Sequence, residues 1–418
     1  MKLTGMMPPR MPASRWRNGR RLVLTAIAAT ATAAACLIGA TAAASAATAR
    51  SERSFGAAAR SATAAAAANL AVLPAGQTGS GSDVPWRLVG PGWFLAEYTT
   101  GSYKEARPVT LYLFDPAGGR YELYRWAATT SPWQIADWSG DKSRALLEQP
   151  GETSTVRQLA LATGKITTIH LSSRPQYVLG YTRPDGTSLL VSKDGIDRLS
   201  LSGTLQARLI SGAGYSAAIS APSGTTELVN GPAGLELVSN AGGIVRRLPV
   251  PGATAKLGGC TPVRWWNSAT ALATCISNTD IYAPRVWLVP VSGSAPTALT
   301  PRRNGDDGDY GDLDAWRFGK TVYVQALGGC GTRYIGRQSA SGKVTPVNVK
   351  GSSGNNAVVA TSGSRMLVQE FAECTPSSSL VWLNPATRAV QDVLMAPATG
   401  GGEGVVAVVP YNRDGEQP

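Results

Sequence analysis

One pattern recurs seven times between Trp86 and Leu394: an apolar hairpin, a polar loop and a second hairpin with a turn at its tip. The repeats begin near residues 86, 134, 177, 216, 261, 313 and 357. Apolar residues alternate along each run, which indicates half-buried strands, and no run has the period of a helix. A period of about 40 to 50 residues is typical of radially repeated four-stranded sheets. We therefore predict an all-β fold, a seven-bladed β-propeller of four-stranded antiparallel blades.

The turns and the last strand support this ring. Pro184-Asp185-Gly186 and Asn267-Ser268 supply the backbone conformations that tight hairpin turns need. A further apolar run over 404–411 follows the last repeat. Pairing of this run with the N-terminal blade would remove a free sheet edge. We expect the propeller to span 83–411, closed by this strand, with a tail over 412–418.

Several repeats resemble TolB-type propeller repeats. WSGDKSRALL from Trp138 and RPDGTSLLV from Arg183 are similar to the turn and aliphatic strand of those repeats. GDLDAW from Gly311 and VQALGGC from Val324 resemble a group of secreted TolB-like proteins of high-GC bacteria. The resemblance covers about 85–411. It implies a propeller fold, but its motifs are structural turns and carry over no active-site residue.

Residues 1–46 have the features of a signal peptide. Basic residues without an acid precede an uncharged stretch, which ends at an A-x-A site over Ala44-Ser45-Ala46. Arg20-Arg21 permits twin-arginine export, and Sec export stays open. Alanine and threonine add little hydrophobicity, so no stable transmembrane span is expected. The Ala/Ser/Thr/Gly-rich segment 47–82 is predicted to be a disordered linker. We predict a secreted, extracellular protein that this linker can tether to a surface.

The charge pattern argues against nucleic acid as a partner. The chain has 39 basic and 27 acidic residues, and six of the basic ones lie in the signal peptide. The mature part keeps only a mild positive excess and no Lys/Arg run, so no nucleic-acid groove is predicted. The expected partner is an extracellular or cell-envelope protein or glycan, bound by a monomer.

Four cysteines follow the signal peptide, an even number that favours disulfides in an exported protein. Cys260 and Cys275 are equally distant from the Asn267-Ser268 turn, so we expect them to face each other and to form one bridge. Cys330 and Cys374 hold the same position in consecutive repeats, and we predict a second bridge there. Zinc is the less favoured alternative, because no C-x-x-C spacing or nearby histidine accompanies them.

The strand order assigns the long loops to one side of the ring. We call the two open sides of the ring face one and face two. If the first strand of each blade runs from face one to face two, the loops between hairpins and between blades lie on face one. These loops begin at Tyr98, Gln149, Ile276 and Pro301. Long loops on a rigid scaffold are the usual place of binding. The candidate ligand-binding residues on face one are Tyr103, Tyr282, Asp306, Asp309, Tyr310, Asp312 and Asp314.

The acidic stretch NGDDGDYGDLD is the sharpest of these candidates. Clustered carboxylates on a Gly-rich loop can hold Ca²⁺, here at Asp306, Asp309 and Asp312, although the spacing differs from an EF-hand. A solvated acidic turn and a catalytic carboxylate pair are the alternatives. No cofactor is required by the pattern.

Trp138, Tyr181, Trp265 and Trp316 recur near the end of the first strand in four repeats. We expect them to pack between blades, and a stacking platform for sugars is the alternative. His170 is the only histidine and no G-x-S-x-G occurs, so histidine-dependent hydrolysis is hard to build. The sequence favours a binding scaffold without catalysis. A carbohydrate-active or Ca²⁺-assisted hydrolase using residues 306–314 is the alternative.

Overall fold

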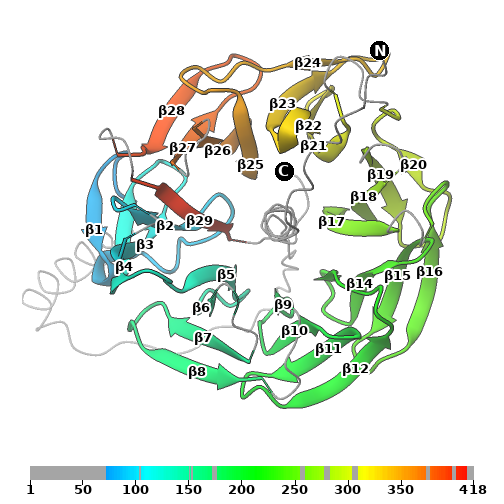
Figure 1. The fold of residues 1–418 in the computed structure, drawn as a ribbon, viewed down its shortest axis with the longest axis horizontal. Helices are drawn as coiled ribbons and strands as arrows, with labels where there is room; N and C mark the ends of the chain where they lie inside the picture. Colours follow the sequence, from blue (N-terminus) through cyan, green and yellow to red (C-terminus); the bar gives the residue numbers. More distant parts are fainter. Residues whose placement is uncertain are drawn as a thin grey trace, which may run out of the picture.

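The computed structural model describes residues 72–411, except for 103–104, 150, 152–153, 172–176, 255–258, 277–282, 304–308, 373–376 and 398–401. The strands form a ring of seven four-stranded antiparallel blades around a central axis (Figure 1). The predicted all-β propeller is confirmed. The described residues contain no α-helix, and their helical structure consists of two short 3-10 turns, η1 (Gly81–Asp83) and η4 (Gly329–Gly331).

Six blades are built from four consecutive strands each, counted from the axis outward. Blade two consists of β5 (Gln134–Trp138), β6 (Arg144–Glu148), β7 (Thr155–Ala160) and β8 (Ile166–His170). Blade three consists of β9 (Tyr177–Tyr181), β10 (Ser188–Ser192), β11 (Gly195–Ser200) and β12 (Leu205–Ser211). Blade four consists of β13 (Ala218–Ser220), β14 (Thr226–Gly231), β15 (Gly234–Ser239) and β16 (Ile244–Pro249). Blade five consists of β17 (Cys260–Asn267), β18 (Thr270–Ile276), β19 (Pro284–Pro290) and β20 (Thr297–Ala298). Blade six consists of β21 (Asp312–Phe318), β22 (Thr321–Leu327), β23 (Arg333–Gln338) and β24 (Val344–Pro346). Blade seven consists of β25 (Asn355–Ser362), β26 (Arg365–Phe371), β27 (Ser378–Leu383) and β28 (Val390–Leu394).

Blade one combines strands from both ends of the described chain. Its strands, from the axis outward, are β29 (Gly404–Pro410), β2 (Phe94–Thr99), β3 (Arg107–Phe114) and β4 (Arg120–Thr129). Strand β29 pairs antiparallel with β2, with Val409 opposite Leu95 (Figure 1). The sequence pattern had left the partner of this last strand open, and the partner is β2.

The start of blade one differs from the sequence expectation. The run from Trp86 was predicted to be the first strand of a hairpin, but residues 86–88 and 91–92 form turns. Leu88 is 43% exposed, and Gly90, Pro91 and Gly92 interrupt any longer strand. The innermost position is occupied by β29 instead, so the C-terminal strand replaces the predicted one.

The segment just before blade one is also ordered onto the ring. Residues 78–80, which composition assigned to the linker, form strand β1 (Thr78–Ser80) parallel to β4. The backbone N–H of Leu73 donates a hydrogen bond to the Tyr121 hydroxyl at 3.2 Å. Blade one therefore carries a fifth strand, which covers part of its outer edge.

Polar side chains connect neighbouring blades within the apolar interior. In every second strand, two apolar residues are followed by a polar one at the same structural position: Glu97, Glu148, Ser192, Asn230, Thr274, Gln325 and Gln369. Thr274 Oγ1 donates to the carbonyl of Leu313 on the next blade at 2.7 Å. Gln325 Oε1 accepts from the N–H of Val358 on the next blade at 2.7 Å.

Thr274, Gln325 and Gln369 thus bind backbone groups in the innermost strand of the next blade, which would otherwise lie unpaired in the interior. Asn230 instead binds Gly214, Ser216 and Ala217 of its own blade. Glu97 serves the same purpose between blades one and two, where its Oε1 accepts from the N–H of Ile135 at 3.1 Å. We call Glu97, Thr274, Gln325 and Gln369 the seam residues, because their hydrogen bonds fix how one blade sits on the next.

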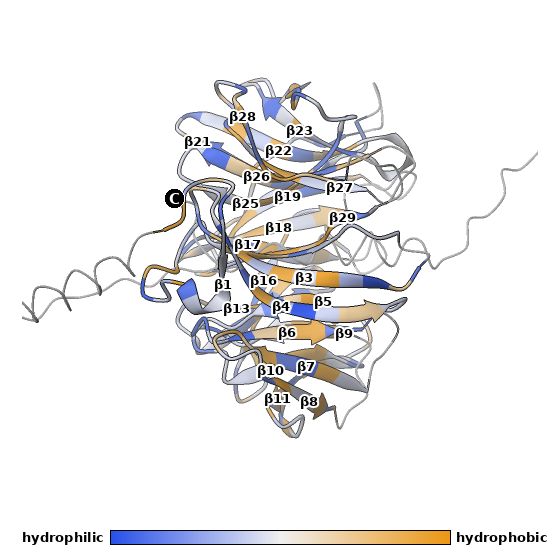
Figure 2. Cartoon of the chain, turned by 90° about the vertical axis from the view of Figure 1, so that its left-hand side faces the viewer, coloured by the Kyte–Doolittle hydropathy of each residue, from blue (hydrophilic) through white to orange (hydrophobic). Residues whose placement is uncertain are grey.

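The recurring aromatic residues lie in the core. Trp138, Tyr181, Trp265 and Trp316 are between 1% and 4% exposed. The indole N–H of Trp265 donates to the carbonyl of Ser220 in the preceding blade at 2.8 Å. These side chains thus pack in the core, as expected, and because they are buried they offer no stacking platform for a sugar. Seen from the side, apolar segments lie within the strands and many polar segments at their ends and in the loops (Figure 2).

Candidate functional site

Face one carries the longer connections of the ring. The hairpin tips of face two are short, such as residues 139–143 between β5 and β6 and 268–269 between β17 and β18. Face one holds 100–106, 149–154, 277–283 and 299–311. The strand order therefore places on face one the same loops that the sequence assigned to it. Any site built from loops therefore has most of its material on face one.

A disulfide reinforces blade five where it meets face one. Cys260 and Cys275 lie opposite each other in strands β17 and β18, and they are bonded. Both are buried. The predicted Cys260–Cys275 bridge is confirmed. Cys374 and the side chain of Cys330 lie outside the described residues, so the Cys330–Cys374 bridge stays a prediction.

The described part of the acidic stretch is held by an arginine. Nε of Arg303 lies 3.2 Å from Asp309 Oδ2 and 3.4 Å from Asp312 Oδ2. Burial raises the pKa of Asp312 to about 6, and the charge of Arg303 opposes this rise. A guanidinium thus occupies the position between these carboxylates, and a cation would have to displace it.

The remaining acidic-loop candidates are only partly described. Asp306 and Asp307 lie outside the described residues. The calcium site predicted at Asp306, Asp309 and Asp312 therefore stays a prediction. Among the residues that the structure describes, no group of three or more His, Cys, Asp or Glu side chains is arranged to hold a metal ion.

Asp314 belongs to the interior. Its Oδ1 accepts hydrogen bonds from the N–H of Ala315 at 2.7 Å and from Nη2 of Arg264 at 3.1 Å. Burial raises the pKa of Asp314, and Arg264 opposes this rise. A similar buried pair joins Asp137 to Arg183 at 2.8 Å between blades two and three. The structure thus gives Asp314 an interblade contact with Arg264, and a part of Asp314 in ligand binding stays a prediction.

Of the three tyrosine candidates, Tyr310 alone lies among the described residues. Tyr310 precedes β21, and its backbone N–H donates to the carbonyl of Leu327 at 2.9 Å. Tyr103 and Tyr282 lie outside the described residues. Binding by these three residues stays a prediction. His170 ends the outer strand β8, where its side chain is exposed.

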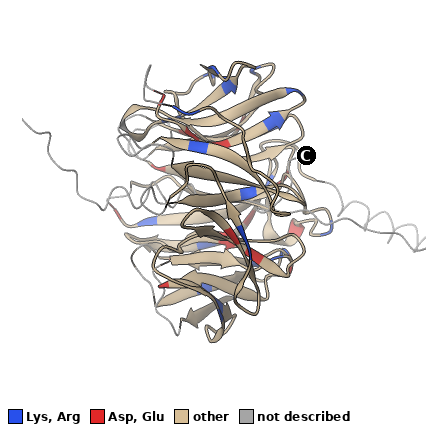
Figure 3. Cartoon of the chain, turned by 90° about the vertical axis from the view of Figure 1, so that its right-hand side faces the viewer, with Lys and Arg blue, Asp and Glu red and all other residues tan. Residues whose placement is uncertain are grey.

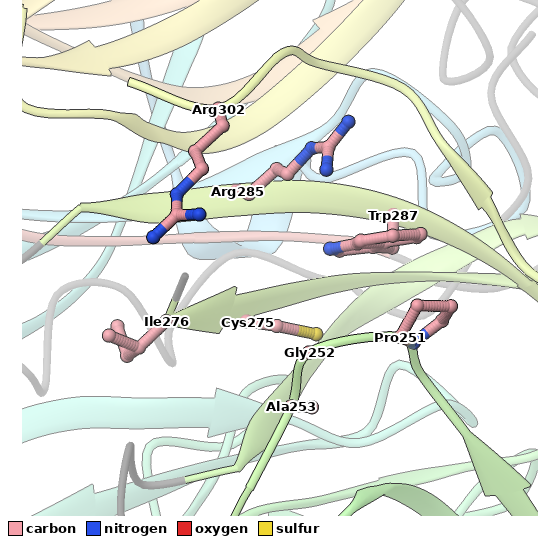
Figure 4. A pocket seen from close by; sticks show the side chains of 8 residues that line it. All are labelled: Pro251, Gly252, Ala253, Cys275, Ile276, Arg285, Trp287 and Arg302. Carbon is pink, nitrogen blue, oxygen red and sulfur yellow. The ribbon is translucent and has the colours of Figure 1, made fainter. Parts of the chain in front are cut away.

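A small pocket that the sequence did not indicate opens on face one between blades four and five (Figure 4). Its volume is about 100 Å³, and its walls are Pro251, Gly252, Ala253, Cys275, Ile276, Arg285, Trp287 and Arg302. The first three belong to the connection between β16 and β17, and Arg302 belongs to the connection between β20 and β21. Cys275 in the wall is the disulfide-bonded cysteine.

Two arginines give this pocket its charge. Arg285 and Trp287 lie on the same side of β19, with the Arg285 guanidinium carbon 4.7 Å from the centre of the Trp287 ring. Nε of Arg285 donates to the carbonyl of Thr300 at 2.6 Å. Burial and the nearby charge of Arg302 lower the pKa of Arg285. No side chain in the pocket wall is acidic.

Sequence reasoning missed this pocket because its residues are far apart in the chain. The alternation of Arg285 and Trp287 on one strand was visible, but nothing in the sequence placed Arg302 beside them. On the side of the ring shown in Figure 3, most basic positions lie apart, with acidic positions among them. No described helix is long and apolar enough to cross a membrane.

Comparison with known proteins gives likenesses of fold. No family model matches the chain, and no curated protein matches its sequence. TolB from Acinetobacter baumannii is similar over 76% of this chain and 66% of its own, with 11% identity and a TM-score of 0.41. This chain thus spans just under two thirds of that TolB chain.

Two further solved structures show the same level of similarity. The β-propeller domain of the Trilobed protease from Pyrococcus furiosus is 12% identical, with a TM-score of 0.46, over 73% of this chain and 95% of that domain. An oligogalacturonate lyase from Vibrio parahaemolyticus is 10% identical, with a TM-score of 0.41, over 73% of this chain and 92% of its own. At such identities the likeness concerns the fold alone.

Proposed function

We propose that this protein is a secreted or surface-tethered β-propeller scaffold that binds an extracellular or cell-envelope partner through face one. The observation that carries the proposal is the asymmetry of the ring. Face two has short hairpin tips, whereas face one combines long connections, a buried disulfide and a pocket with two arginines. A rigid ring with loops on one side suits binding, because the loops are held in place before the partner arrives.

Export is part of the same proposal. Residues 1–46 act as the signal peptide, and the segment up to residue 71 acts as a tether. The Cys260–Cys275 disulfide supports an oxidising compartment, because such bridges are rare in reducing ones. N-terminal sequencing of the exported protein tests this step. A new N-terminus near Ala47 is expected, and an uncut chain retained in the cytoplasm would contradict it.

Site-specific photocrosslinking in intact cells tests the binding face. A photoreactive residue replaces Arg302 on face one in one variant and Lys320 on face two in a matched variant; both positions are exposed. We expect a discrete crosslinked product from position 302 and none from position 320. Equal products from both positions would contradict binding through face one, as would products from position 320 alone.

Replacement of residues 304–308 by Gly-Ser provides a second test. The change shortens the longest connection on face one but keeps Arg303 and its contacts with Asp309 and Asp312. We expect the crosslink from position 302 to weaken. Unchanged capture by this variant would show that the loop takes no part in binding.

A further inference from the structure

The charges that the ring exposes are divided unequally between its two faces. On face two, the charged residues that are not buried, in the connections or at the adjoining strand ends, are nine basic and three acidic: Arg87, Arg120, Lys142, Arg144, Lys165, Lys320, Lys343, Arg365 and Arg388 against Asp83, Asp141 and Asp185. The described residues in the same positions of face one are five of each sign: Lys193, Arg302, Arg303, Arg333 and Lys350 against Glu105, Glu148, Asp194, Asp309 and Glu403. Face two is thus clearly basic, whereas the described part of face one is balanced.

The basic residues of face two lie on one half of the ring. Arg87 is in the segment that leads into blade one, and the other eight belong to blades six, seven, one and two, which are neighbours (Figure 1). We call the face-two surface of these four blades the basic sector. Its charge is spread over a broad area and is not gathered at one point.

Exposed apolar side chains also favour face two. Six large apolar side chains are exposed in the described part of the chain, and five of them lie in face-two segments or at the face-two ends of strands: Val72, Leu88, Leu205, Ile244 and Val245. Val72 and Leu88 precede β1 and β2 and so lie at blade one, inside the basic sector, while the other three begin the outer strands of blades three and four. Basic residues combined with exposed apolar ones are typical of proteins that bind the surface of an anionic membrane.

The chain enters the ring on the same face. The backbone N–H of Gly76 donates to the carbonyl of Gly118 at 3.0 Å, and that of Arg120 donates to the carbonyl of Gln77 at 3.0 Å. Gly118 lies in the turn between β3 and β4, which is a face-two turn of blade one. A tether formed by the preceding residues would therefore hold face two, and not face one, toward the surface to which it is attached.

We propose that the basic sector docks on the surface of an anionic lipid bilayer and leaves face one turned away from the membrane. A charge spread over four blades matches a plane of many head groups better than one small anion. Each basic side chain close to such a plane strengthens binding about fivefold, and Leu88 adds an apolar contact with the head-group layer. This inference goes beyond the proposed partner of face one and depends on it only for what the exposed face captures.

Co-sedimentation of the exported, purified protein with vesicles measures this docking. Vesicles of phosphatidylcholine alone are compared with vesicles made of equal parts of phosphatidylcholine and phosphatidylglycerol, each at low and at high NaCl. We expect binding to the anionic vesicles at low salt, little binding to the neutral ones, and a strong loss at high salt, because salt screens exposed charges.

Two matched double variants locate the charges that bind. Lys165→Gln/Lys343→Gln removes two exposed charges from the basic sector, and we expect the partition coefficient for anionic vesicles to fall at least about tenfold. Lys193→Gln/Lys350→Gln removes two charges from face one and should change it less than about twofold. Both pairs are surface residues, and circular dichroism checks that the fold is kept.

A second matched pair tests the apolar contact. Leu88 is 43% exposed on face two, and Met395 is 46% exposed on face one. Leu88→Ser should weaken vesicle binding several-fold, whereas Met395→Ser should leave it unchanged. Neither variant should alter retention on immobilised polyphosphate, a polyanion without an apolar layer.

Several outcomes would overturn the inference. Equal binding to neutral and anionic vesicles would refute it, as would an equal loss in the two double variants. Retention on polyphosphate without binding to anionic vesicles would replace the membrane with a polyanionic wall polymer.

The photocrosslinking experiment keeps this inference separate from the proposed function, since a lipid partner gives no discrete protein product from position 320. Vesicle binding without a crosslink from position 302 would keep the docking of face two and reject partner capture by face one. A crosslink from position 302 without vesicle binding would do the opposite.

Discussion

The buried Glu97 allows a quantitative test of the seam residues. Its carboxyl group is inaccessible to solvent; Oε1 accepts from Ile135, and Oε2 has no hydrogen-bond partner among the described residues. Burial raises the pKa of Glu97 well above its ordinary value of 4.5, and the hydrogen bond from Ile135 opposes this rise. The folded protein therefore keeps Glu97 in its neutral form up to a higher pH than the unfolded chain does.

The sign of the effect on stability follows from proton binding. Above pH 4.5 the unfolded chain releases the proton of Glu97, while the folded chain keeps it. Stability is therefore unaffected below the unfolded pKa and falls as pH rises toward the folded pKa. Each pH unit between the unfolded and the folded pKa costs about 1.4 kcal/mol, so about 3 kcal/mol is the upper limit of the penalty at pH 7.

Glu97→Gln should remove this penalty. Glutamine occupies the equivalent position in blade six, where Nε2 of Gln325 donates to the carbonyl of Asn356 at 2.8 Å. By analogy, the carbonyl of Trp133, two residues before Ile135, is the expected acceptor for a glutamine at position 97. We expect the variant to be more stable than the wild type by up to about 3 kcal/mol at pH 7 and equally stable at pH 4.

Urea denaturation of both proteins at pH 4, 5, 6 and 7 measures this difference. Gln325→Glu is the reciprocal control, because it places a carboxyl group in the same position of another blade, and it should lose stability as pH rises. A Glu97→Gln variant that is less stable at pH 7, or a difference that does not change with pH, would refute the reasoning.

Three further predictions concern the bridge, the closure and the acidic loop. The double variant Cys260→Ala/Cys275→Ala should lose about 3 kcal/mol in urea denaturation, because the bridge spans 15 residues, and the reduced wild type should match it. Tyr411 packs on Trp138 with ring centres 5.2 Å apart and donates to the carbonyl of Gly140, so Tyr411→Phe should lose about 1 kcal/mol and Tyr411→Ala about 2 to 3 kcal/mol. Ca²⁺ at a hundred times its dissociation constant for a site formed by Asp306, Asp309 and Asp312 should stabilise the protein by about 2.7 kcal/mol relative to EDTA. Arg303→Gln should strengthen that thermal shift, since a competing guanidinium is removed, and replacement of the three aspartates by asparagine should abolish it.

The architecture was predictable because each repeat carries its own pattern. Alternating apolar residues and turn signals, such as Pro184-Asp185-Gly186, define each hairpin locally, and seven copies leave few alternatives. The Cys260–Cys275 bridge was predictable for the same reason, since both cysteines belong to one hairpin. The start of blade one was not predictable in this way. Whether the run from Trp86 or the last strand is innermost depends on competition for one edge, which local patterns do not describe.

The candidate site was much less accessible from sequence. The acidic stretch was conspicuous, but the structure pairs Asp309 and Asp312 with Arg303 and Asp314 with Arg264. These partners lie in separate strands and loops. The seam residues had a signal that was missed, because a polar residue recurs at the same place in every second strand. The pocket had none, since Arg285 and Arg302 line it together only through the arrangement of blade five and its neighbours.

The closure of blade one has a consequence for how the chain is made. Strand β2 is synthesised near the beginning and β29 at the end, yet the two are neighbours in one sheet. All six other blades can form before β2 gains its inner partner. A chain that stops before residue 404 therefore displays an open strand edge, which a complete chain conceals. Chaperones or proteases that recognise open edges can thus distinguish unfinished molecules from finished ones.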